Sequence, residues 1–250
     1  MTLEPGLRFI GIDLAWSPRN ASGVAALAPA DGGLAVLACD RVVSDDAIAA
    51  FVAAHRGTGT VVMVDAPLRV PNEAGNRACE RELNRAFARF QAGAHPSNRR
   101  NQLRDGVIRG EALARRLAAL GVREATLAEA GRGHTMYECY PHAAHVVLFG
   151  LARTLKYKKE RQPWAEAHAA FETLLAHLQA LAEPRLVLDA ALLAALAPAG
   201  SRGQGYKARE DRADAILCAY LGALAVLGRM EMLGTVEEGH IVVPRSGQAI

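Results

Sequence analysis

The sequence predicts an α/β protein with a mixed five-stranded sheet, flanked by helices and interrupted by a helical insertion. Three observations support this class. Three short apolar runs follow one another near the N-terminus with turn-forming residues between them, which is typical of an antiparallel meander. A helical pattern and then a continuously apolar strand come next, as in a crossover to a parallel strand. Amphipathic and apolar segments fill the C-terminal half, as expected of helices that cover a sheet.

The meander strands are expected to start at Leu7, Ser22 and Leu34, in the runs FIGID, SGVAALA and LAVLACD. Residues 17–20 and 31–33 form the turn clusters between them. Short connections of this kind join antiparallel neighbours.

Ser44 is expected to cap a helix with two carboxylates in its first turn, where the helix dipole favours negative charge. The next strand begins at Thr60 and stays apolar until Asp65, and Pro67 ends it. A continuously apolar strand is expected to be buried on both faces.

Residues 69–121 are predicted to form an Arg-rich helical insertion within a single domain that spans residues 1–250. Eleven arginines lie between positions 69 and 116, around a helical stretch near 80–90 and a polar loop at 92–102. No internal repeat or low-complexity linker divides the chain, so one domain is preferred to two.

The C-terminal half is predicted to hold one strand and four helices. The strand begins at His134, and the helices span 141–150, 163–182, 186–196 and 207 to about 230. Pro141 suits the first helical position, where its missing N–H is not needed. The last helix is apolar nearly all round after its first turn, so we expect it to be central and buried.

The composition excludes a disordered chain. Of 250 residues, 51% are hydrophobic and 22% charged, and the net charge of +3 neither requires nor excludes a nucleic-acid partner. The four cysteines form no CxxC pair, so neither a disulfide framework nor a structural zinc site is expected. The chain has no signal-peptide pattern and no apolar run long enough for a bilayer, so we expect a cytoplasmic protein without a membrane segment.

Four acidic residues lie where the chain offers no obvious ion-pair partner. Asp13 and Asp65 each end an apolar strand, and Asp211 and Asp214 share one face at the start of the last helix. Singly, each could be a turn residue, a helix cap or a solvated side chain. Together they would repel one another unless a cation neutralised them, and Mg²⁺ or Mn²⁺ suits carboxylate ligands. Two such ions could promote phosphodiester hydrolysis.

Two further residues have both a chemical and a structural interpretation. Glu138 could be an additional catalytic carboxylate or metal ligand, or it could bond to the N-terminus of the helix at Pro141. His142 could donate to a phosphate or transfer protons, or it could be a structural residue of the helix's first turn.

Basic residues provide candidate phosphate contacts. Arg77 and Arg81 lie four positions apart, hence on one helix face, and Lys156 and Lys158 flank a tyrosine. Lys207 follows a glycine-rich loop that could approach a phosphate, although such loops are common before helices. The preference for Arg over Lys throughout the chain could equally be a compositional bias.

Five motifs carry a family resemblance. These are GIDLAW from Gly11, VDAPL from Val64, RxCEREL from Arg77, YECYPHAA from Tyr137 and DRADAILCAY from Asp211. In this order they resemble domain-of-unknown-function family 429, whose members are described as predicted nucleases of the ribonuclease H-like fold.

The resemblance implies a ribonuclease H-like fold with Asp13 and Asp65 as metal ligands, completed by Asp214 or by its rival Asp211. The helix from Ser44 lacks the glutamate that ribonucleases H place there, so the acid pattern more closely resembles that of Holliday-junction resolvases.

We therefore predict a nuclease that uses Mg²⁺ or Mn²⁺ and acts on a nucleic acid. One alternative is a non-catalytic ribonuclease H-like module that binds nucleic acid or protein. Another is a nucleotide-binding phosphotransferase, which the length disfavours because such proteins use two domains of this kind around one nucleotide.

Overall fold

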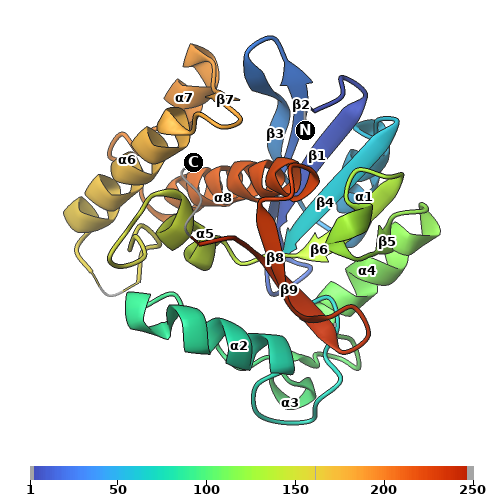
Figure 1. Cartoon of the computed structure of the whole chain (residues 1–250). Coiled ribbons are helices and arrows are strands. Elements are labelled where there is room, and N and C mark those ends of the chain that lie inside the picture. The colour runs from blue at the N-terminus through green and yellow to red at the C-terminus, as the bar shows by residue number, and fades with distance from the viewer. Residues whose placement is uncertain (1–2, 161, 247–250) are drawn as a thin grey trace.

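A seven-stranded mixed sheet forms the centre of the fold, in the order β5-β6-β4-β1-β2-β3-β7 (Figure 1). The computed structural model describes residues 3–160 and 162–246. The antiparallel meander consists of β1 (Leu7–Asp13), β2 (Ser22–Ala30) and β3 (Gly33–Val42), and β4 (Gly59–Asp65) and β6 (His134–Glu138) continue the sheet in parallel. The predicted mixed sheet with an N-terminal meander is confirmed.

The predicted count of five strands is too low because the two edge strands are very short. Strands β5 (Arg123–Glu124) and β7 (Leu186–Val187) have two residues each, too few to show an alternating pattern. The helix expected from residue 186 starts later, as α7 (Ala190–Leu196). Its start is set by Asp189, whose side chain accepts a hydrogen bond of 2.7 Å from the Leu192 N–H.

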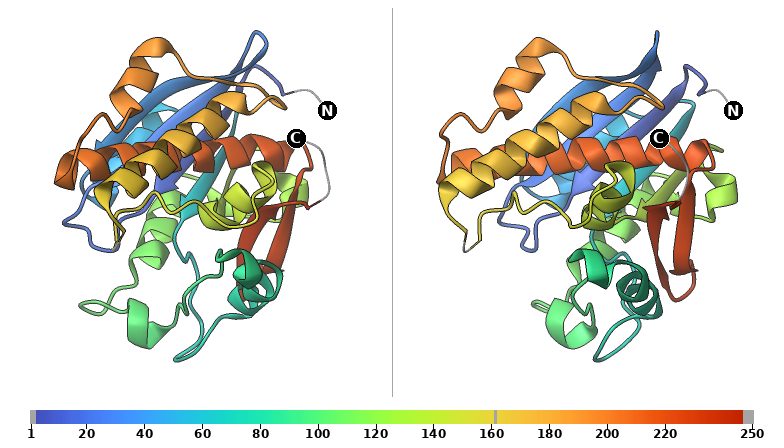
Figure 2. Two further views of the ribbon diagram at one scale, coloured as in Figure 1. Left: turned by 90° about the vertical axis from the view of Figure 1, so that its left-hand side faces the viewer. Right: turned by 60° about the vertical axis from the view of Figure 1, so that its left-hand side comes forward.

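Helix α8 (Gly203–Val226) crosses one face of the sheet, and α6 (Trp164–Ala180) and α7 lie outside it (Figure 2). The helix can approach β1 closely because Gly11 has no side chain. A Cβ atom there would lie 1.9 Å from the carbonyl oxygen of Ala215 in α8. The prediction of a central, buried last helix is confirmed, since every residue from Ala213 to Val226 is buried.

Helices α1 (Asp45–Ala54) and α4 (Arg109–Ala119) cover the opposite face of the sheet. Ile48 and Leu117 from these helices pack in one core cluster with strand residues such as Ile12 and Val64. Although α4 falls within the Arg-rich segment 69–121, it belongs to this second helical layer.

The first half of the Arg-rich segment lies beyond the end of the sheet, as Figure 1 shows. It contains α2 (Ala78–Phe87), a 3₁₀ turn (Ala88–Phe90) and α3 (Arg99–Gln102). Helix α2 shares a core cluster with α5 (Pro141–Leu148) and with a hairpin of β8 (Met230–Thr235) and β9 (Gly239–Pro244). We did not expect this hairpin from the sequence. The last helix ends at Val226, not near 230, so Met230 begins a strand.

Within the described part of the chain, no helix combines the length and apolar character that crossing a membrane requires.

Candidate active site

Two carboxylates lie side by side at the carboxyl ends of neighbouring parallel strands. Asp13 ends β1, Asp65 ends β4, and the two are paired in the strand register. Side chains two residues apart on a strand share a face, so Asp13 points to the same side as Gly11, towards α8. Parallel strands are about 4.8 Å apart, which brings the two half-buried carboxylates close together.

Asp214 of α8 supplies a third, fully buried carboxylate, and two consecutive residues hold it. The Tyr157 hydroxyl donates a 2.6 Å hydrogen bond to Oδ1. The Lys158 ammonium lies 2.9 Å from Oδ2. The ammonium is the partner of Oδ2 among the described residues, so this buried oxygen depends on Lys158. Both contacts come from the irregular segment between α5 and α6.

Asp13, Asp65 and Asp214, hereafter the acid cluster, perturb one another. Burial raises the pKa of Asp13 well above its ordinary value, and the neighbouring carboxylates add to the rise. Burial and the same repulsion raise the pKa of Asp65 to about 7, while Lys158 opposes both shifts. For Asp214, burial pushes the pKa up, but Lys158 and the Tyr157 hydroxyl outweigh burial and lower it. The three carboxylates therefore share one electrostatic environment, with Lys158 as its main cation.

Asp211 points to a different neighbourhood. Its carboxylate lies 2.8 Å from Nε of Arg41 on β3 and also pairs with Lys207. The structure thus brings Asp214, and not Asp211, together with Asp13. Lys207 is about half exposed and also influences the acid cluster, because its charge opposes the rise of the Asp13 pKa.

Arg77 is buried and committed to two carboxylates, so the predicted phosphate contact is wrong. Its two terminal nitrogens donate to Glu138 at 2.8 and 2.5 Å, and its Nε donates to Glu80 at 2.9 Å. The side chain is only 1% exposed. A guanidinium in this position stabilises buried charge and is inaccessible to a nucleic acid.

Glu138 plays neither of the roles that the sequence allowed. Besides the two bonds from Arg77, it accepts a 3.1 Å hydrogen bond from the Leu68 N–H. The helix at Pro141 has no side-chain cap, so Glu138 does not serve its N-terminus. With both oxygens engaged, Glu138 ties the end of β6 to the chain after β4. It contributes charge near Asp65 rather than a free ligand.

The other predicted substrate residues differ in exposure and in their partners. Arg81 is exposed and donates a 2.6 Å hydrogen bond to the Asn76 carbonyl. Lys156 is also exposed. His142 lies near the acid cluster, with Nδ1 3.2 Å from the Thr154 hydroxyl. Burial and the Lys158 charge lower the His142 pKa to about 4, so its imidazole is neutral at pH 7.

Sequence reasoning assigned no role to Tyr157, which fixes Asp214, or to Glu80, which shares Arg77. Tyr157 lies among three lysines, and that position was the only signal that could have drawn attention to it. Glu80 lies three residues after Arg77, the spacing of a helical pair, but nothing in the sequence shows that the pair is buried.

The side chains of the acid cluster have the chemistry of a metal site, although they are not arranged around an ion. Across residues 3–160 and 162–246, no group of three or more His, Cys, Asp or Glu side chains is arranged to hold an ion. The donor set nevertheless consists of hard carboxylate oxygens from Asp13, Asp65 and Asp214, which are the ligands that Mg²⁺ and Mn²⁺ prefer. Asp13 and Asp65 are the residues that could hold a divalent cation, with Asp214 behind them.

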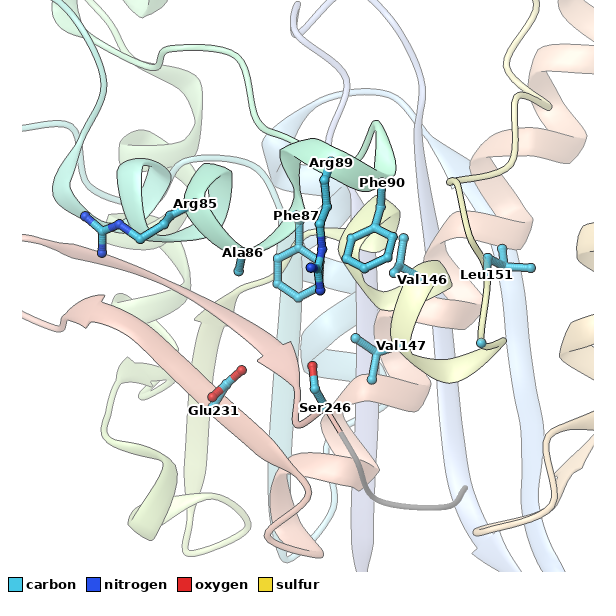
Figure 3. Close-up of a pocket in the computed structure, with 11 residues that line it drawn as sticks. Arg85, Ala86, Phe87, Arg89, Phe90, Val146, Val147, Leu151, Glu231 and Ser246 are labelled. Carbon is cyan, nitrogen blue, oxygen red and sulfur yellow. The ribbon is translucent and has the colours of Figure 1, made fainter.

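A separate groove of about 600 Å³ lies between α2, the end of α5 and β8 (Figure 3). Its lining includes two arginines, Arg85 and Arg89, and one acid, Glu231. The Arg89 guanidinium lies 4.5 Å from the centre of the Phe90 ring. No residue of the acid cluster lines this groove.

The comparisons with known proteins identify a family and no individual relative. The model of a family described as "Protein of unknown function (DUF429)" matches residues 11–238. No curated protein and no solved structure matches the chain. The matched span begins just before Asp13 and contains the whole acid cluster, together with Tyr157 and Lys158. The chain belongs to the DUF429 family of proteins of unknown function.

Proposed function

We propose that this protein is a divalent-metal-dependent nuclease and that the acid cluster is its active site. One observation carries the proposal. Three carboxylates from β1, β4 and α8 meet at the carboxyl end of the sheet, although burial and mutual repulsion raise the pKa of two of them. Ligand sites of open α/β sheets lie at the carboxyl ends of the strands. A cluster that opposes its own ionisation is typical of a functional site.

The ligand chemistry favours Mg²⁺ or Mn²⁺. When bound, either ion would make a water molecule a better nucleophile and stabilise charge on the phosphate. Half-buried Asp13 and Asp65 would hold the ion at the surface, and Asp214 would support it from the interior. In the reaction, the water oxygen bonds to phosphorus and the bond from phosphorus to the leaving ester oxygen breaks. The water gives up one proton, and the leaving oxygen takes one.

A row of exposed arginines along α2 and the 3₁₀ turn could hold the nucleic acid. Arg81, Arg85 and Arg89 follow one another at four-residue intervals along α2 and the 3₁₀ turn, and all three are exposed. Helix α5 has His142 at its end near the acid cluster and Val147 at its end in the groove. Its eight residues span about 12 Å. A strand leaving the acid cluster along α5 would therefore reach Arg85 and Arg89, which line the groove.

A second candidate is a module that binds nucleic acid without cleaving it. The observation that favours it is the ion pair between Lys158 and Asp214, which neutralises part of the acid cluster without a metal. This candidate predicts binding that weakens with salt and does not change when metal is removed.

A cleavage panel separates the two candidates. Single-stranded, duplex, hybrid and branched substrates are incubated with Mg²⁺, Mn²⁺ or a chelator, using the wild type and Asp13→Asn. The nuclease should cleave at least one substrate only with metal, and Asp13→Asn should bind that substrate without cleaving it. Asp211→Asn is the matched control, because Asp211 lies one turn from Asp214 but outside the acid cluster. Binding without cleavage of any substrate by the folded wild type would favour the non-catalytic module.

A further inference from the structure

We propose that the Lys158 ammonium takes the place of a second metal ion, so that the acid cluster works with one divalent cation and one lysine. The inference rests on the proposed function and specifies how many ions its site uses. It replaces the phosphate-gripping role that the sequence suggested for Lys158.

Neighbouring contacts hold Lys158 in place. Tyr157, the preceding residue, donates from its hydroxyl to Asp214 at 2.6 Å and accepts a 2.6 Å hydrogen bond at its carbonyl from Tyr206. On the other side of Lys158, the backbone N–H of Lys159 donates a 3.1 Å hydrogen bond to the Glu210 carboxylate of α8. The backbone on either side of Lys158 is therefore tied to α8. A side chain supported in this way loses little freedom when it takes up its working position.

The ammonium is placed where it can reach both the buried carboxylate and the site opening. Its Nζ lies 2.9 Å from Asp214 Oδ2, and the side chain is 30% exposed. Its charge is also the largest attractive influence on Asp13 and on Asp65. Lys158 therefore interacts with all three members of the acid cluster.

Charge balance favours one ion over two. The three carboxylates carry three negative charges, which one divalent cation and the ammonium would neutralise completely. Two divalent cations together with the ammonium would leave an excess of two positive charges in a partly buried site, which is unfavourable. A second ion could bind only if Lys158 left Asp214.

An ammonium can do what the second ion does in a two-metal site. That ion stabilises the charge that develops on the leaving oxygen. Lysine offers a compact positive charge with three donors, and it would act on this oxygen without forming a bond to phosphorus. The leaving oxygen keeps the electron pair of the broken bond and takes a proton from water, and Lys158 stays protonated.

The number of bound Mn²⁺ ions tests the inference without any substrate. Isothermal titration calorimetry, supported by electron paramagnetic resonance of the bound ion, is carried out on the wild type, Lys158→Met, Lys158→Arg and Lys207→Met. We expect one ion per chain in the wild type and in Lys158→Arg. Lys158→Met should bind the first ion at least about tenfold more tightly and accept a second, because a positive charge a few ångströms from the ion is gone.

Lys207→Met is the matched control. It removes another lysine that influences Asp13 but pairs with Asp211, and it should keep a stoichiometry of one. In the cleavage assay, at a Mn²⁺ concentration that fills only the first site, Lys158→Met should turn over at least about tenfold more slowly than the wild type. Tighter metal binding combined with slower turnover is a result that a purely structural lysine would not produce.

The outcomes that overturn the inference differ from those that overturn the nuclease. Two ions in the folded wild type would refute the role of Lys158 and leave the metal-dependent nuclease standing. No bound Mn²⁺ in the wild type, at millimolar concentration, would refute both. The wild-type stoichiometry decides the question even if Lys158→Met does not fold.

Discussion

Replacing Arg77 with methionine should destabilise the protein strongly, because Arg77 is the counterion of two buried carboxylates. The Glu80 and Glu138 side chains are 0% and 5% exposed. When ionised, both can only accept hydrogen bonds, so they depend on a donor such as Arg77. Methionine is unbranched and fills part of the space, so the main effect is the loss of charge compensation. Breaking a buried ion pair by removing one partner costs about 3–5 kcal/mol.

That magnitude predicts a measurable fall in thermal stability. In a chain of this length, each kcal/mol lowers the melting temperature by about 2–4 °C, so Arg77→Met should melt about 6–20 °C below the wild type. Burial already raises the pKa of Glu138 despite Arg77. Without the guanidinium this pKa rises further, so the lost stability should be smallest at acid pH, where Glu138 is protonated, and should grow as the pH rises.

Urea unfolding and thermal melts at pH 5 and pH 7 measure this effect. Arg81→Met is the matched control, because Arg81 lies one turn further along α2 and is exposed. It should change the free energy of unfolding by less than about 0.5 kcal/mol. The reasoning is refuted if Arg77→Met retains wild-type stability but loses nucleic-acid binding, since Arg77 would then be a phosphate contact.

Three further predictions concern the acid cluster, the sheet and the arginine row. In metal-free protein, Asp65→Asn should raise the melting temperature more at pH 8 than at pH 5. Burial raises the Asp65 pKa to about 7 in the folded protein, so the stability linked to its protonation is lost progressively between the ordinary Asp pKa of about 4 and pH 7; an equal shift at the two pH values would count against this. Gly11→Ala should destabilise by several kcal/mol in urea unfolding, because its Cβ would lie 1.9 Å from the α8 backbone, and a neutral effect would contradict that packing. The double variant Arg85→Ala/Arg89→Ala should lower the salt dependence of nucleic-acid binding by about two counterions. Arg132→Ala should leave the salt dependence unchanged, because Arg132 is exposed and precedes β6 at its N-terminal end, whereas the acid cluster lies at the carboxyl ends of the strands.

The parts of the fold that the sequence predicts are those with a strong local pattern. The meander, the buried strand ending at Asp65 and the apolar last helix were recognisable because burial leaves continuous apolar runs. The hairpin of β8 and β9 was missed because short strands that pack on a distant helix depend on tertiary contacts. Asp189 explains the shifted start of α7, since a cap decides where a short helix begins.

The sequence was enough to predict which carboxylates form the candidate site, but not which basic side chains pair with them. Asp13 and Asp65 end neighbouring apolar strands, and strand order alone brings such residues together. Lys158 belongs to an irregular segment and Asp214 lies in α8 more than fifty residues later, so no local pattern encodes their pairing. Arg77 looked like a surface arginine because only the folded chain shows that two glutamates enclose it.

The most direct test of the central claim is a crystal of the protein soaked in millimolar Mn²⁺ and measured for anomalous scattering. The nuclease proposal predicts a manganese peak at coordination distance, about 2.1 Å, from carboxylate oxygens of both Asp13 and Asp65. The absence of any peak there, with the two carboxylates and Asp214 pointing apart, would contradict it.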